Sequence, residues 1–270
     1  MLRLWRDSVH IAIYRDAAVL ARIPRGLRRS IQASHTERPD NTAGGGLAAL
    51  EAALQDRQWH GADATVLVSN SLVRYSLMPS SPELVTDQDE RDFALHRIGQ
   101  THGEPAGGWQ VRLGYPLLQC SQPVAALDAA FIEQLKAVLG AARLRPTAIR
   151  PFFMHAYNGA RARIRENDFW FANVEPDNLL LARVKAGSWT SLSVRPTGQS
   201  SLKETLAARL AEASLLDGEE QAAGRLYVHA PGNRETPRDL GPGIEAVHLC
   251  PSPGSISPDA RLALGQVLGV

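Results

Sequence analysis

Short apolar runs separated by polar turns make up the first 80 residues. Four of them predict strands, because they are rich in β-branched and large apolar residues in buried or alternating patterns: residues 8–14, 17–23, 64–69 and 72–79. The first two strands meet at Arg15 and Asp16, and the last two are predicted partner strands joined by a turn that begins with Asn70. Between the pairs, the polar, glycine-rich stretch 34–46 predicts a loop, and leucines three and four residues apart predict a helix over 47–59.

Helical periodicity dominates the next part of the chain. Residues 86–103 predict a helix that begins with a capping pair, Thr86 and Asp89. Residues 124–144 predict the strongest helix, since apolar residues recur at every fourth position through it. A short strand is predicted between these helices, at 109–115.

A second group of strands and helices follows residue 150. Three short strands with two tight turns predict an antiparallel meander over residues 168–196. Helices are predicted at 153–164 and 202–216, and single strands at 225–230 and 245–250. Each half of the chain therefore has a run of antiparallel strands followed by helices and further strands.

This repeated order predicts an α/β protein built on mixed sheets. The proline-bounded stretch 146–151 breaks the pattern and is the predicted boundary between the halves. We expect one subdomain over 1–150, a second over 151–250, and a linker with a short helix over 251–270.

Charge and cysteine content narrow the function classes. The 270 residues include 29 Lys and Arg against 28 Asp and Glu, a net charge of +1, so no global basic field favours nucleic acid. The two cysteines, Cys120 and Cys250, lie in no metal-binding spacing and cannot form a disulfide framework. No apolar stretch reaches the length of a membrane span, so we expect a cytoplasmic protein with no transmembrane segment and no metal site.

The first 39 residues are locally basic, with eight arginines against three acidic residues (8 − 3 = +5). Arg22, Arg25, Arg28 and Arg29 form the densest part of this segment. Such a run is either a solvated strand exit or a patch that meets acidic partners or anionic lipid headgroups. The second interpretation would place the protein peripherally at the inner membrane.

Catalytic motifs are absent from the sequence. It contains no dinucleotide fingerprint, no phosphate loop, no nucleophile elbow and no zinc-protease motif. His155 and His229 have apolar sequence neighbours, which favours core histidines over catalytic bases.

Six stretches together resemble a known family: VLVSNSLVRYSLMP, DQDERDFALHRIGQTHG, WQVRL, RPTAIRPFFMHAYN, FWFANVEPDNLLLARVKAGSWTSLSV and RLYVHAPG. They are similar to the cytoplasmic actin-like domains of bacterial pilus and type II secretion assembly proteins. These comprise the PilM-type pilus protein, the MSHA-pilus biogenesis protein and the secretion L protein. The resemblance covers roughly residues 1–250. It implies two subdomains of ribonuclease-H-like topology that face each other across a cleft.

In nucleotide-binding members of such a family, a glycine-rich acidic hairpin from each half cradles phosphates. The resemblance assigns Arg15 and Asp16 to the first hairpin turn, and Glu175, Asp177 and Asn178 to the second. Neither turn contains glycine, although backbone N–H groups approach phosphate most closely at residues without a Cβ. A glycine pair expected near the end of the chain is reduced to a single residue, Gly232.

These departures predict no cofactor and no ATP hydrolysis. The leading hypothesis is a non-catalytic scaffold that binds a peptide segment of inner-membrane assembly proteins, in a groove between the halves or on the basic segment. The alternatives are an actin-like or sugar-kinase-like phosphotransferase or ATPase, and an unrelated α/β domain. A homodimer remains open, and no nucleic-acid partner is expected.

Overall fold

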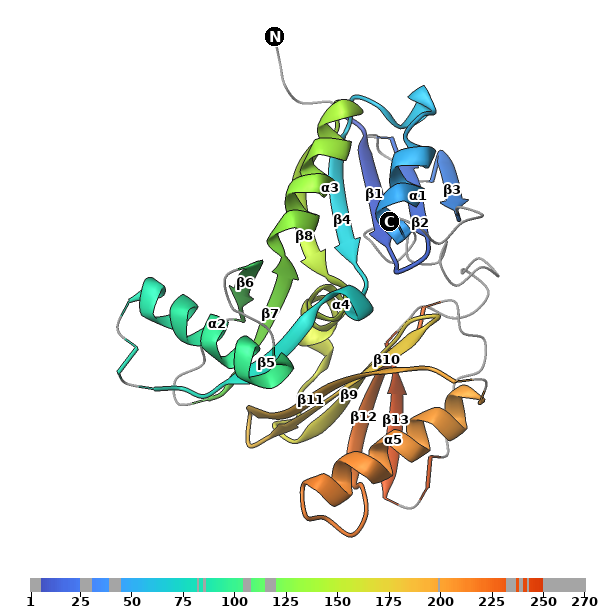
Figure 1. Ribbon diagram of the computed structural model, residues 1–270. Helices are drawn as coiled ribbons and strands as arrows, with labels where there is room; N and C mark the ends of the chain where they lie inside the picture. The colour runs from blue at the N-terminus through green and yellow to red at the C-terminus, as the bar shows by residue number, and fades with distance from the viewer. Residues whose placement is uncertain are drawn as a thin grey trace.

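The computed structural model describes residues 6–24, 31–38, 45–81, 83–84, 86–103, 108–114, 120–198, 200–231, 237, 240–241 and 243–249. Within these ranges the strands form two five-stranded sheets and one three-stranded sheet. Figure 1 shows the two larger sheets at opposite ends of the molecule, with the small sheet to one side.

The first five-stranded sheet has the order β3-β2-β1-β4-β8 (Figure 1). Its strands are β1 (Ser8–Ile13), β2 (Ala18–Ile23), β3 (Ala33–Glu37), β4 (Asp63–Val68) and β8 (Arg145–Pro151). β1, β2 and β3 are antiparallel, β4 is parallel to β1, and β8 is parallel to β4. Helices α1 (Gly45–Ala53) and α3 (Ala129–Ala141) supply Leu50, Leu135 and Leu139 to the core beside this sheet.

The second five-stranded sheet repeats this plan in the order β11-β10-β9-β12-β13. Its strands are β9 (Phe169–Val174), β10 (Asn178–Lys185), β11 (Ser188–Pro196), β12 (Gly224–His229) and β13 (Ile244–His248). The first three are antiparallel and the last two parallel to β9, as in the first sheet. Helix α5 (Leu202–Leu216) packs Leu206 and Leu210 against one face, and α4 (Phe152–Ala160) lies between the two sheets (Figure 1).

The small sheet has the order β5-β7-β6, with all neighbours antiparallel. It consists of β5 (Arg74–Met78), β6 (Trp109–Leu113) and β7 (Gln122–Asp128), and α2 (Asp87–His102) covers it. The predicted cap of α2 is confirmed, because the Thr86 hydroxyl and the Asp89 carboxylate satisfy each other's backbone N–H groups. Buried Ala94 and Ile98 of α2 pack in the core of this unit.

Two predictions for the first 80 residues were wrong. The stretch 34–46 is not all loop, since β3 occupies part of it and α1 begins at Gly45. Gly46 packs α1 against the β1–β2 turn: its N–H donates to the Arg15 carbonyl at 2.9 Å, and a Cβ there would lie 1.9 Å from the Tyr14 oxygen. The second error concerns β5, which pairs with β7 in the small sheet and not with β4.

Two further errors lie between residues 122 and 151. The first part of the predicted helix 124–144 is strand β7, whose residues from Gln122 to Leu127 are all buried. A strand buried on both faces shows no alternation, so its alanines and leucine merged with the true helical pattern of α3. The predicted break at 146–151 is β8, a terminal strand that accommodates prolines because its outer edge has no partner strand among the described residues.

The subdomain limits 1–150 and 151–250 remain predictions, and residues 251–270 lie outside the described part of the chain. In the described part, no helix combines the length and the apolar character that crossing a bilayer requires.

Candidate functional site

Two tight turns, one from each five-stranded sheet, border the same cavity. The β1–β2 turn contributes Arg15, and the β9–β10 turn contributes Asp177 and Asn178. β11 supplies another part of the lining, and the turn after β4, which includes Asn70, supplies the remainder together with β5 and the C-terminal end of α2. This space of about 600 Å³, which we call the cleft cavity, corresponds to the predicted groove between the halves.

The other predicted hairpin residues do not line the cleft cavity. Asp16 lies in the β1–β2 turn with its Oδ2 3.9 Å from Nε of Arg38. Glu175 turns inward and is only 4% exposed. Gly232 lies outside the described residues. The structure therefore brings together Arg15, Asp177 and Asn178 from the predicted set.

Glu175 is a buried carboxyl group at the contact between the two halves. Its Oε2 accepts a hydrogen bond of 2.9 Å from the backbone N–H of Asn70, which follows β4. Burial raises the pKa of Glu175 to about 8, because the charged form loses water, although the Asn70 bond acts in the opposite direction. Glu175 is therefore mostly protonated at neutral pH.

The Asn70 side chain makes three hydrogen bonds. Its Nδ2 donates to Oδ1 of Asn173 at 2.7 Å, and its Oδ1 accepts from the Tyr75 hydroxyl at 2.6 Å and from the Phe153 backbone N–H at 3.0 Å. Asn70 is 1% exposed and Asn173 is fully buried. One side chain thus ties the end of β4 to β5, α4 and β9.

His229 extends this network across the second sheet. Its Nδ1 lies 3.1 Å from Nδ2 of Asn173, so Nδ1 accepts the bond and the ring proton is on Nε2. Burial lowers the pKa of His229 to about 3, because a charged imidazole would lose its water. Asn70, Tyr75, Asn173, Glu175 and His229 form what we call the polar bridge.

The sequence pattern did not predict most of the polar bridge. It placed Asn70 in a turn and Asn173 inside a strand, and it interpreted His229 as a core residue, which its 5% exposure confirms. The available signal was a polar residue within each of two apolar strands, Asn173 in FWFANV and His229 in RLYVHA. Buried polar side chains need partners, so their presence in buried strands predicts that they meet others.

A second hollow lies within the first half and was not predicted. Terminal strands β6 and β8 border it, together with β7 and α3, and its volume is about 310 Å³. We call it the edge groove. Its lining is mainly apolar, with a few polar side chains: Gln110, Arg112, Ala125, Leu127, Ile132, Lys136, Pro146, Thr147, Ala148, Ile149 and Pro151.

One member of the predicted basic patch has a structural role. Nη2 of Arg22 lies 2.9 Å from Oδ2 of Asp7, and its Nη1 donates to the carbonyls of Gln58 and His60. The Arg22 side chain is only 19% exposed. Arg25, Arg28 and Arg29 lie outside the described residues, so a patch formed by all four arginines remains a prediction.

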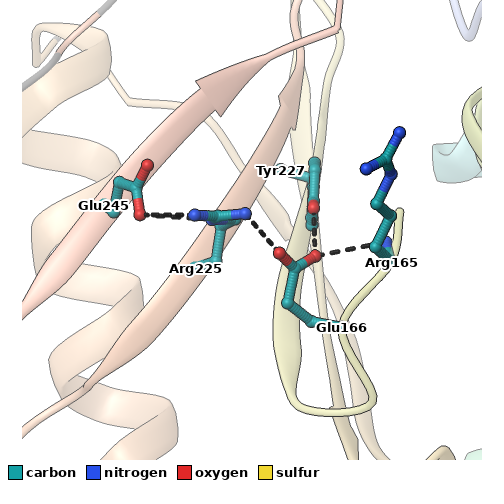
Figure 2. Close-up of polar contacts among 5 residues, drawn as sticks. All are labelled: Arg165, Glu166, Arg225, Tyr227 and Glu245. Carbon is teal, nitrogen blue, oxygen red and sulfur yellow. Dashed lines mark hydrogen bonds and ion pairs between the residues drawn. The ribbon is translucent and has the colours of Figure 1, made fainter. Parts of the chain in front are cut away.

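A further ion-pair cluster lies at the opposite end of β12 from His229. Figure 2 shows Arg225 between two carboxylates. Its Nη2 lies 2.9 Å from Oε2 of Glu245, and its Nη1 pairs with Oε1 of Glu166. Glu166 also accepts a hydrogen bond from the Tyr227 hydroxyl. The Tyr227 bond is the main reason that the pKa of Glu166 is lowered. The cluster joins β12 to β13 and to the loop before β9. Within the described ranges, no three His, Cys, Asp or Glu side chains gather as a metal site requires.

Comparison of the whole structure with solved structures identifies the fold. A Bacteroides thetaiotaomicron protein with an actin-like ATPase fold and unknown function matches with a TM-score of 0.60 and 11% identity, over 98% of each chain. The chain has the actin-like fold. The cytoplasmic domain of EpsL, an inner membrane component of the type II secretion system of Vibrio cholerae, matches with a TM-score of 0.54 and 12% identity, over 96% of this chain and 92% of that one.

One chain of a PilM–PilN type IV pilus biogenesis complex also matches, with a TM-score of 0.57 and 13% identity, over 82% of this chain and 80% of that one. No protein-family model matches the sequence, and no curated protein sequence matches it. The predicted actin-like architecture is thus confirmed at the level of the fold.

The actin-like fold gives the two turns their significance. They occupy the positions that the resemblance assigns to phosphate-cradling hairpins, yet the second turn folds its Glu175 side chain into the polar bridge. Pro176 in that turn has no N–H to offer a phosphate. Asp177 lines the cleft cavity and would repel one.

Proposed function

We propose that the chain is a non-catalytic, cytoplasmic scaffold that binds inner-membrane assembly proteins of a pilus or type II secretion system. The observation that carries this proposal is the polar bridge. Side chains of both halves bond to each other where an actin-like ATPase would present backbone N–H groups to phosphates. The fold that the chain shares with EpsL and with a chain of a PilM–PilN complex supports inner-membrane assembly proteins as its partners.

The edge groove is the proposed docking site for an extended peptide segment of a membrane partner. Its apolar lining provides pockets for alternate side chains of the peptide. Among the described residues, β6 and β8 are the outermost strands of their sheets where they border the groove. A strand-like peptide can add main-chain hydrogen bonds to such an edge. Pro146 and Pro151 have no N–H group, so along β8 only the residues between them can donate main-chain hydrogen bonds to the peptide.

We expect no ATP binding in the low micromolar range. Micromolar affinity requires about −8 kcal/mol, and glycine-free turns with a buried carboxyl group and an exposed proline supply few phosphate donors. Isothermal titration with Mg-ATP is the measurement. A dissociation constant below about 10 μM would instead support the phosphotransferase or ATPase alternative, and Asp16, Glu175 and Asp177 would become candidate metal-site acids.

Substituting Ala148 by arginine is expected to weaken peptide binding at least tenfold, because a long charged side chain then fills the edge groove. The probes are synthetic peptides that cover the cytoplasmic segments of all single-pass inner-membrane proteins of the host. Ala33→Arg is the matched control, since Ala33 is a half-buried alanine on β3, at the other edge of the same sheet. If no peptide binds, or if both variants lose binding equally, the edge groove is not the docking site.

A further inference from the structure

The cleft cavity carries more positive than negative charge. Among the described residues, its lining includes Arg15, Arg74 and Arg195 and one carboxylate, that of Asp177 (3 − 1 = +2), and Arg74 already has a partner within the chain. Arg15 and Arg195 are exposed, and they come from different halves of the chain. Clefts lined by one sign of charge concentrate ligands of the opposite sign. The cleft cavity therefore favours an anionic ligand.

Two terminal strands border the same cavity. β11 pairs only with β10 among the described residues, and β5 only with β7. Residues 192–196 of β11 all line the cavity and are half-buried or exposed. No described strand hydrogen-bonds to the outer edge of β11, although β5 lies near it, and an unpaired edge can accept an added strand.

Asn178 lies in the wall of the cavity and has a buried side-chain acceptor. It is 3% exposed and lines the cavity, and its Oδ1 has no hydrogen-bond partner within the described residues. Its Nδ2 donates to Oδ1 of Asp177 at 2.9 Å and to Oγ of Ser69 at 3.3 Å. Because Oδ1 is shielded from solvent, Asn178 belongs to the fixed wall of the cavity, and a ligand reaches the arginines and the edge of β11 instead.

We propose that the cleft cavity binds an extended acidic segment of a second partner protein, which adds as a strand along β11. Five residues of β11 line the cavity, so the bound segment would span about 17 Å at about 3.4 Å per residue. Its carboxylates meet the arginines, and its backbone N–H groups meet the carbonyl groups of β11. A small anion would satisfy the arginines and leave the strand edge unused. With the edge groove on the first half, the chain holds two partners at once.

The probe is a fluorescein-labelled heptapeptide of alternating glutamate and valine, and its binding is followed by anisotropy at low salt. We expect the double variant R15S/R195S to weaken binding at least tenfold. The control is R57S/R91S, which removes two exposed arginines that do not line the cavity. Unchanged binding in R15S/R195S, or an equal loss in the control, overturns the proposal.

Changes to the peptide test the strand addition without altering the protein. N-methylation of its alternate backbone nitrogens and replacement of every glutamate by glutamine should each abolish binding. Retained binding of the N-methylated peptide contradicts strand addition.

Two other occupants of the cavity are tested directly. Displacement of the labelled peptide by tripolyphosphate or Mg-ATP, at lower concentrations than the unlabelled peptide requires, would make the cavity a small-anion site. An arginine-dependent dimer in sedimentation would make it a self-association site. Either result overturns the proposal. The edge-groove peptides are a different set, so unchanged binding in R15S/R195S leaves the proposed function standing, whereas displacement by Mg-ATP would count against both proposals.

Discussion

Replacing Asn70 by alanine is expected to lower the free energy of unfolding by about 3 to 4 kcal/mol. The substitution removes three side-chain hydrogen bonds and leaves Oδ1 of Asn173, the Tyr75 hydroxyl and the Phe153 N–H buried without their partner. A buried polar group left without a partner costs about 1 to 3 kcal/mol, which outweighs the intrinsic value of each bond. Urea denaturation followed by tryptophan fluorescence measures the change.

Asn158→Ala is the matched control for this substitution. Asn158 is an exposed asparagine on α4, and surface changes of this kind usually stay within about 0.5 kcal/mol. A loss below about 1 kcal/mol for Asn70→Ala would mean that the polar bridge does not hold the halves together.

The stability of the protein should fall as the pH rises through neutrality, and Glu175→Gln should remove this fall. The pKa of Glu175 is raised from 4.5 to about 8 in the folded state, so the unfolded chain releases its proton first. Its contribution is fully present below about pH 4.5 and is lost as the pH rises to about 8, with a slope of at most about 1.4 kcal/mol per pH unit.

His229 acts with the opposite sign. Its pKa is lowered from 6.5 to about 3, so its contribution is present above about pH 6.5 and is lost as the pH falls toward 3. Because His229 is common to the wild type and to Glu175→Gln, the difference between their free energies of unfolding isolates Glu175. The two proteins should converge near pH 4 and diverge steadily up to pH 8, with the variant the more stable.

Urea denaturation curves of the wild type and of Glu175→Gln at several pH values provide the measurement. Glu51→Gln, an exposed glutamate of α1, controls for the loss of a carboxyl group and should stay within about 0.5 kcal/mol of the wild type. Parallel stability profiles for the wild type and Glu175→Gln would show that Glu175 is not buried as the structure has it.

The hydrophobic pattern predicts those parts of the fold in which strand and helix periods stay separate. The β9–β10–β11 meander and the helices α2 and α5 follow from it, and the order of strands and helices in the two halves indicated the repeated sheets. The pattern fails where pairing between strands far apart in the sequence determines the secondary structure. β7 shows no alternation because it is buried on both faces, and β8 contains two prolines, which its position at the end of the sheet accommodates.

The candidate site was predictable only in part. The positions of Arg15, Asp177 and Asn178 in two turns follow from local turn chemistry. The meeting of Asn70 with Asn173 joins residues 103 positions apart in the sequence, so no local pattern reveals it. The inward orientation of Glu175 depends on that same contact, because the Asn70 N–H holds its carboxyl group.

We propose that the chain works as a scaffold whose partner binding needs no nucleotide. The most direct test is the dissociation constant of the tightest-binding membrane-partner peptide, measured with and without millimolar Mg-ATP on the wild type and on Ala148→Arg. The account predicts equal affinity in both conditions for the wild type and at least tenfold weaker binding for the variant. Peptide binding that appears only with Mg-ATP would contradict it.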